Sequence, residues 1–152
     1  MPNPLRETVM ASISRDELRR RVRGAWTLVN EHRIERQTIQ VGWLVARIRE
    51  ALAQRPPSDT AAALIGDLRD CATELRLRVA GTGFDHVAHL AATMIDICQG
   101  LGQNICDPDQ RWLAVLPQIA GAVAKSFSRE RECIRASRQI SEAVGRHTQV
   151  VH

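Results

Sequence analysis

The fold is decided by residues 58–101, which are SDTAAALIGDLRDCATELRLRVAGTGFDHVAHLAATMIDICQGL. Apolar side chains recur here every three or four residues, the spacing that places them on one face of an α-helix. The first series is Leu64, Leu68, Cys71, Ala72, Leu75 and Val79, and the second is Phe84, Val87, Leu90, Ala91, Met94, Ile97 and Leu101. Gly81-Thr82-Gly83 interrupts the pattern. The stretch therefore predicts two amphipathic helices joined by a short turn, with Ser58 or Asp59 as the cap of the first.

The chain before this stretch has the same helical periodicity. Ser14 and Glu17 have the spacing of a capping box, which predicts a helix over about 14–31. Its expected buried face consists of Leu18, Val22, either Trp26 or Ala25, and Val29. A second helix, or a continuation after a bend near 31–34, carries Ile39, Trp43, Leu44, Ile48 and Leu52. It ends at Arg55-Pro56-Pro57, because the residue before a proline avoids the helical conformation.

After the stretch, Asp107-Pro108 predicts the start of another helix, with proline at its first position. Its expected buried face is Trp112, Leu113, Leu116, Ile119, Val123 and Phe127. Pro117 predicts either a kink or a new helix start. The Arg-rich stretch 129–146 continues the helix, with Ile134, Ile140 and Val144 as apolar anchors.

These patterns predict an all-α protein, because no stretch has the alternation of a strand. Short connections favour antiparallel neighbours, so we expect an up-down four-helix bundle with an additional N-terminal helix and a long C-terminal helix. The expected organisation is a flexible N-terminus over 1–13, one helical domain over 14–146 and a tail over 147–152.

The composition is that of an ordinary globular chain of 152 residues, 44% hydrophobic and 25% charged. Aromatic residues are only 3%, so the core should be aliphatic. No apolar run reaches the roughly 18 residues of a membrane span, and the N-terminus has no apolar signal-peptide region. We therefore expect a cytoplasmic protein that does not bind membranes. Cys71 and Cys98 fall on apolar faces and are expected to be buried thiols.

The net charge is +4, from 20 Arg, one Lys and 17 acidic residues, and it is concentrated at the two ends. Residues 1–36 carry +3, residues 37–128 carry −1 and residues 129–152 carry +2. This distribution argues against a broad nucleic-acid stripe. It leaves an alternative function, a helical nucleic-acid-associated accessory or regulatory protein that uses its basic end helices. Arg19-Arg20-Arg21 and Arg23 would contact phosphates, with Trp26 in the core.

One polar patch lies on the outer face of the helix that contains Leu68. On a helical wheel with Leu68 at the centre of the buried face, Thr73 and Leu77 lie at about 140° and 180°. Arg69 and Arg76 lie on the flank at about 80–100°. A threonine, two arginines and an exposed leucine therefore share one outward surface.

Residues 72–84, Ala72-Thr73-Glu74-Leu75-Arg76-Leu77 through Gly83 and Phe84, resemble a histidine-containing phosphotransfer (Hpt) domain. A helix of that family carries Ala-His-x-Leu-Lys-Gly, followed by a small-residue turn ending in glycine, here Gly83. The next helix of the family has apolar residues at the spacing of Val87, Leu90 and Met94. The resemblance covers roughly 37–128 and implies a four-helix bundle in two-component signalling.

The sequence departs from the family at the reactive position. Thr73 stands where the phosphoacceptor histidine would be, Arg76 replaces a lysine, and Leu77 replaces a glycine. A threonine hydroxyl has a far higher pKa than an imidazolium and no base beside it, so phosphotransfer should be absent. The resemblance then implies a non-enzymatic protein without cofactor. The sequence leaves the monomer and the homodimer open as oligomeric states. The protein would bind a response-regulator receiver domain or a histidine kinase through Arg69, Thr73, Arg76 and Leu77.

Asp85-His86-x-x-His89 is the remaining constellation. Its two imidazoles lie on neighbouring helical faces, a weak alternative for a metal site or a displaced phosphoacceptor. No Glu-x-x-His set accompanies them, so we expect surface histidines and no metal.

Overall fold

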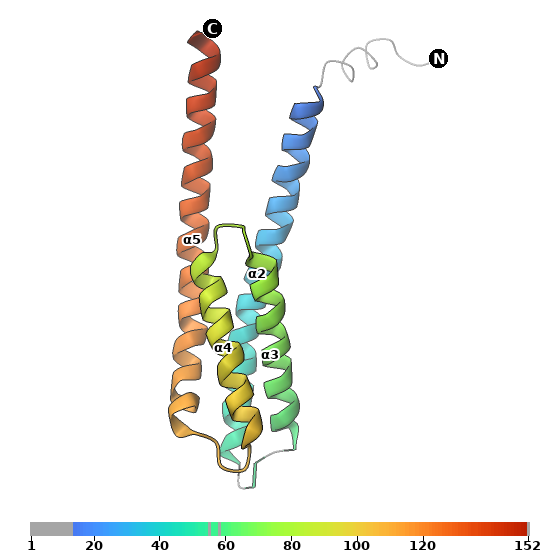
Figure 1. Cartoon of the computed structure of the whole chain (residues 1–152), viewed down its shortest axis with the longest axis vertical. Coiled ribbons are helices and arrows are strands. Elements are labelled where there is room, and N and C mark those ends of the chain that lie inside the picture. The colour runs from blue at the N-terminus through green and yellow to red at the C-terminus, as the bar shows by residue number, and fades with distance from the viewer. Residues whose placement is uncertain (1–13, 55, 58, 152) are drawn as a thin grey trace, which may run out of the picture. The chain divides into compact units, whose positions relative to one another are not determined.

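The computed structural model describes residues 14–54, 56–57 and 59–151, with side chains up to residue 146. It contains α2 (Arg15–Ala53), α3 (Thr60–Val79), α4 (Asp85–Gln103) and α5 (Gln110–Val151), shown in Figure 1. No strand occurs in these ranges, so the all-α prediction is confirmed. The chain divides between Arg33 and Ile34 into two compact units. The stretch 1–13, predicted to be flexible, lies outside the described residues.

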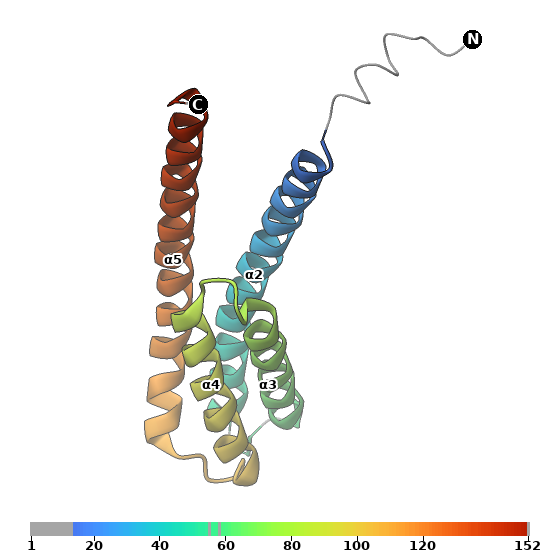
Figure 2. The ribbon, with the colours of Figure 1, turned by 45° about the horizontal axis from the view of Figure 1, so that its top comes forward.

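The second unit is organised around one continuous apolar core between Ile34 and Phe127. In both views α3 lies beside α4, and α4 lies beside the first half of α5 (Figures 1 and 2). The largest side chains with almost no exposure come from all four helices: Ile34, Ile48, Leu68, Leu75, Met94, Leu101 and Leu116. The rings of Phe84 and Phe127 stack with their centroids 5.4 Å apart. The core is therefore mainly aliphatic, as predicted.

The two helices that decided the sequence interpretation have the predicted buried faces. Leu68, Ala72, Leu75 and Val79 of α3 are at most 1% exposed, and Val87, Ala91 and Met94 of α4 match them. Leu64 and Leu90, at the edges of these faces, are half-buried. Gly81 and Gly83 have φ of 71° and 92°, a left-handed conformation that favours glycine, so the turn between the helices is tight.

The sequence predicted capping residues for three helix starts, and the structure differs among them. The Ser14 hydroxyl accepts the Glu17 N–H at 3.1 Å, which confirms the cap of α2. The start predicted at Asp107-Pro108 is two residues too early. The Asp109 carboxylate accepts the Arg111 N–H at 2.9 Å, so α5 begins at Gln110 and Pro108 precedes it. Asp59 occupies the cap position of α3 without a side-chain capping bond, and Ser58 lies outside the described residues.

The separate N-terminal helix is wrong and the alternative of a continuation is correct: residues 15–31 form the first half of α2, which runs unbroken through residues 31–34. The sequence there is Glu-His-Arg-Ile, without a glycine or proline that would break the hydrogen-bond ladder. At the other end, α5 continues through Pro117 and reaches Val151, so its backbone extends into the predicted tail.

The predicted buried face of residues 14–31 is also wrong. Leu18, Val22, Trp26 and Val29 are 47–66% exposed, and Ala25 between them is exposed as well. Ile39 and Trp43 are exposed too, because Leu44 and Val45 supply the inward face there. In α5, Ile134 packs against the core, whereas Ile140 and Val144 are exposed. Helical periodicity finds an apolar face but does not tell whether another element covers it.

A close approach fixes the spacing of α4 and α5. The indole ring of Trp112 occupies the space where a Cβ on Gly100 would lie. A side chain at position 100 would collide with the ring, so glycine is the residue that fits without a shift of Trp112. Gly102, two residues later in the same helix, has open space around it.

We predict that Gly100→Ala destabilises the fold by about 1–3 kcal/mol, the typical cost of overpacking. The matched control is Gly102→Ala, which should leave stability unchanged or raise it by up to about 1 kcal/mol, since alanine favours helix more than glycine. Urea unfolding followed by circular dichroism measures both. Equal stability of the two variants would contradict the packing of Trp112 on Gly100.

Candidate functional site

The candidate site is the outward face of α3, formed by Arg69, Thr73, Arg76 and Leu77 and called here the Leu77 face. All four side chains are exposed, as the wheel predicted. The reason is the helix geometry: Leu68, Ala72 and Leu75 point into the core, so residues on the far side of the helix point to solvent. Leu77 is 72% exposed, more than any other large apolar side chain in the described residues.

The hydroxyl of Thr73 is held within its own helix. It donates to the carbonyl oxygen of Arg69 at 2.8 Å. The neighbouring carboxylate, Glu74, accepts a hydrogen bond from the Gln37 amide of α2 at 3.2 Å. The hydroxyl proton is therefore directed to a carbonyl, which does not act as a base, and this arrangement does not activate a nucleophile.

The two arginines of the Leu77 face keep their charge available to solvent. The Nε atom of Arg69 lies 3.8 Å from the Asp70 carboxylate, a contact between two exposed groups that contributes little to stability. Arg76 has no carboxylate within 4.0 Å among the described residues. The Leu77 face therefore combines one exposed apolar side chain, Leu77, with two cationic neighbours, Arg69 and Arg76.

The two candidate histidines of α4 are both exposed. The backbone N–H of His86 donates to Glu130 of α5 at 3.3 Å, and the N–H of Val87 donates to the same carboxylate at 3.0 Å. Glu130 therefore caps the start of α4, a contact that sequence spacing did not reveal. His86 and His89 belong to no group of three or more potential ligands within the described residues. Two imidazole nitrogens are fewer ligands than a stable protein metal site uses.

The buried thiols lie behind the Leu77 face. Cys71 and Cys98 are buried, as predicted, whereas Cys106 and Cys133 are exposed. Burial raises the pKa of Cys71 to about 11, and the nearby Glu74 carboxylate adds to the increase. Burial also raises the pKa of Cys98 to about 12, against the opposing effect of Arg69. Both therefore remain neutral thiols near pH 7.

A second surface, missed by the sequence interpretation, lies between α2 and α5. Ile39 and Trp43 are exposed and line a groove there. Five of the other lining residues are small: Gly42, Ala46, Ala120, Gly121 and Ala124. The Arg47 guanidinium lies 5.6 Å from the Trp43 ring centre. A sequence signal for this groove exists, because small residues stand four apart in both helices: Gly42 and Ala46 in α2, and Ala120 and Ala124 in α5. Small side chains leave space at the surface between two packed helices.

Comparison with protein families, with curated proteins and with solved structures finds no match for this chain. The helices of the described residues include none long and apolar enough to cross a membrane.

Burial, together with the raised pKa values of Cys71 and Cys98, predicts that the four cysteines react at different rates. In the native protein at about pH 8, Cys106 and Cys133 should react with a thiol-specific reagent within minutes, while Cys71 and Cys98 should react only after unfolding. Counting modified thiols by mass spectrometry before and after denaturation tests this. Rapid modification of Cys98 in the native protein would contradict its burial between α3 and α4.

Proposed function

We propose that this chain is an Hpt-like protein of two-component signalling that binds a response-regulator receiver domain or a histidine kinase without carrying phosphate. The observation that carries the proposal is the exposure of Leu77 next to Arg76, a cation without a carboxylate partner among the described residues, on the outer face of α3. In this proposal the protein is cytoplasmic and acts through binding, with no catalytic step of its own.

The physical case for binding rests on what a partner gains at the Leu77 face. An exposed leucine becomes a favourable contact when a partner covers it, because apolar surface leaves water. Arginines around such an anchor add hydrogen bonds and select an acidic partner surface. Receiver domains accept phosphate on an aspartate, so an acidic site on the partner would complement Arg69 and Arg76.

The absence of phosphate transfer follows from Thr73. Its hydroxyl is bound to the Arg69 carbonyl, and a serine or threonine needs an adjacent base to attack phosphorus. Leu77 would also fill the space that the glycine of the family leaves open for the reacting groups. Both substitutions favour a docking role over a transfer role.

The arrangement of the helices supports the Hpt-like part of the proposal. Gly83 has the left-handed backbone conformation of a turn glycine, and the sequence resemblance aligns it with the turn glycine of the family. Residues 34–53 of α2 and the first half of α5 complete the apolar core around this pair. In this interpretation residues 37–128 form an antiparallel up-down bundle of the Hpt type.

The proposal predicts that Leu77→Asp weakens binding to a purified receiver domain at least tenfold, about 1.4 kcal/mol, because a carboxylate replaces the apolar anchor. Ile140→Asp is the matched control, since Ile140 is similarly exposed on another helix. Titration of each variant against a panel of receiver domains, by fluorescence anisotropy, measures the difference. Equal binding by the two variants would exclude the Leu77 face.

A second measurement separates docking from phosphotransfer. Receiver domains labelled with radioactive phosphate are incubated with the protein, which should acquire no acid-labile label. Label that disappears in His86→Ala or His89→Ala would show that the acceptor has moved to α4 and would overturn the phosphate-free part of the proposal.

A further inference from the structure

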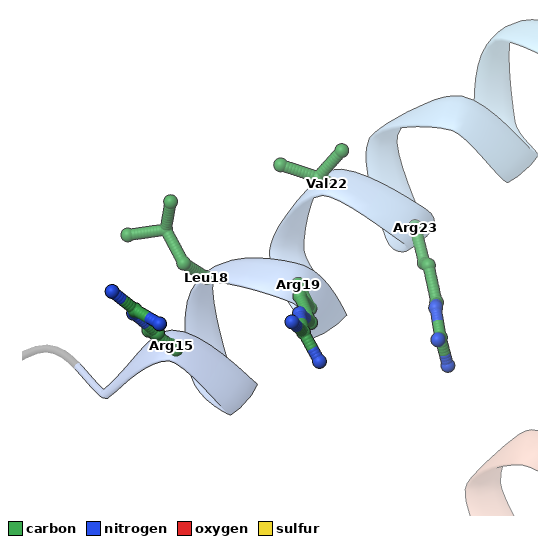
Figure 3. Close-up of a pocket in the computed structure, with 5 residues that line it drawn as sticks. All are labelled: Arg15, Leu18, Arg19, Val22 and Arg23. Atoms are coloured by element: carbon green, nitrogen blue, oxygen red, sulfur yellow. The ribbon is translucent and has the colours of Figure 1, made fainter.

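The first turns of α2 carry two adjoining rows of side chains. Arg15, Arg19 and Arg23 follow one another at four-residue intervals, and Leu18 and Val22 form a second row beside them. Figure 3 shows Leu18 and Val22 projecting from one side of the helix, while Arg19 and Arg23 extend from the adjoining side. This surface is called here the arginine–leucine face. It lies on the first unit, away from α3 in the sequence.

The apolar row of this face is exposed to water. Leu18 is 53% exposed and Val22 is 63% exposed. Trp26, one turn further along the helix beside the arginine row, is 66% exposed. These three large apolar side chains lie within nine residues. Single exposed apolar residues are common on protein surfaces, but a cluster of this kind is typical of an interaction surface.

The charges of the arginine row are not compensated within the described chain. Residues 15–33 contain six arginines and three acids, a net charge of +3. Glu17 pairs with Arg21 at 3.2 Å, on the other flank of the apolar row. Arg15, Arg19 and Arg23 have no carboxylate within 4.0 Å among the described residues. Within the part of the chain that the structure describes, the face therefore presents three guanidinium groups without carboxylate partners, next to apolar surface.

The combination of an arginine row and an apolar row indicates which kind of molecule can bind this face. A second copy of this segment would bring +3 against +3, which opposes association. Nucleic acid would pair its phosphates with the arginines but would leave Leu18, Val22 and Trp26 in water. A partner helix with apolar residues on one face and carboxylates along its flank would do both: its apolar face would cover the apolar row, and its carboxylates would pair with the arginines.

We infer that the arginine–leucine face is a docking site for an acidic amphipathic helix of a partner protein. Leucine or isoleucine side chains of that helix would pack on Leu18, Val22 and Trp26, and its glutamates would pair with Arg15, Arg19 and Arg23. Trp26 is the expected centre of the contact, since tryptophan and arginine dominate the energetics of such interfaces. This site is separate from the Leu77 face and does not depend on the function proposed for it.

The probe is a fluorescein-labelled designed peptide of about 20 residues, with leucines every third or fourth position and glutamates on the flanking positions. A second peptide with the same leucines and lysines in place of glutamates is the charge control. Fluorescence anisotropy with the full chain at roughly 150 mM salt should show binding of the acidic peptide at least tenfold tighter than the basic one.

Variants of the full chain then locate the site. Arg19→Glu should weaken binding of the acidic peptide at least about fivefold, while Arg20→Glu, the same charge reversal on the far side of the helix, should change it less than about twofold. Leu18→Ser with Val22→Ser should also weaken binding at least about fivefold, with an unchanged circular dichroism spectrum. Unchanged binding of the acidic peptide by Arg19→Glu and by the double variant Leu18→Ser with Val22→Ser would overturn the inference.

A duplex DNA oligonucleotide provides the other arm of the test. Should DNA bind through Arg19 at roughly physiological salt, with no effect of the Leu18 and Val22 substitutions and no binding of the acidic peptide, the face would be a nucleic-acid surface and the inference would be wrong.

Discussion

The structure depends on a continuous aliphatic core between Ile34 and Phe127, and on the helix spacing that this core imposes. With two phenylalanines and no tyrosine in the chain, the core is built mainly from aliphatic side chains. Trp112 of α5 packs against this core, and its ring lies where a Cβ on Gly100 of α4 would stand. Glu130 of α5 adds a polar tie by capping the start of α4. These contacts hold α4 against α5, and α3 packs its buried face on α4, which sets the direction in which the Leu77 face points.

The core also determines which surfaces are left for binding. Every apolar side chain described between residues 14 and 33 is exposed, and Ile140 and Val144 of α5 are exposed as well. These residues do not contribute to the core of the second unit, yet they keep helical periodicity and large apolar side chains. The arrangement explains the charge distribution: the basic excess lies on helical segments outside the core, where it is available to acidic partners.

The sequence predicted the α3–α4 pair accurately because its signals agree. Two series of apolar residues, spaced every three or four positions, are separated by a glycine turn. The apolar faces of both helices are buried in the core. Residues 14–31 have the same periodicity, but Leu18, Val22 and Trp26 are exposed, because spacing does not reveal what covers a face. The exposure of Arg69, Thr73, Arg76 and Leu77 was predictable from the wheel. The Glu130 cap and the groove beside Trp43 were not, because they depend on residues distant in sequence that only the fold brings together.

The central claim is that stability resides in the core between residues 34 and 127 and that the apolar side chains of residues 15–33 are free for a partner. Amide hydrogen exchange on the full chain, read by mass spectrometry, tests it most directly. Amides of α3 and α4 should exchange only through global unfolding, whereas those of residues 18–30 should exchange at least about a hundredfold faster, since an uncovered helical segment opens locally. Equal protection of residues 18–30 and of α4 would contradict the claim, because it would show that these side chains are already covered.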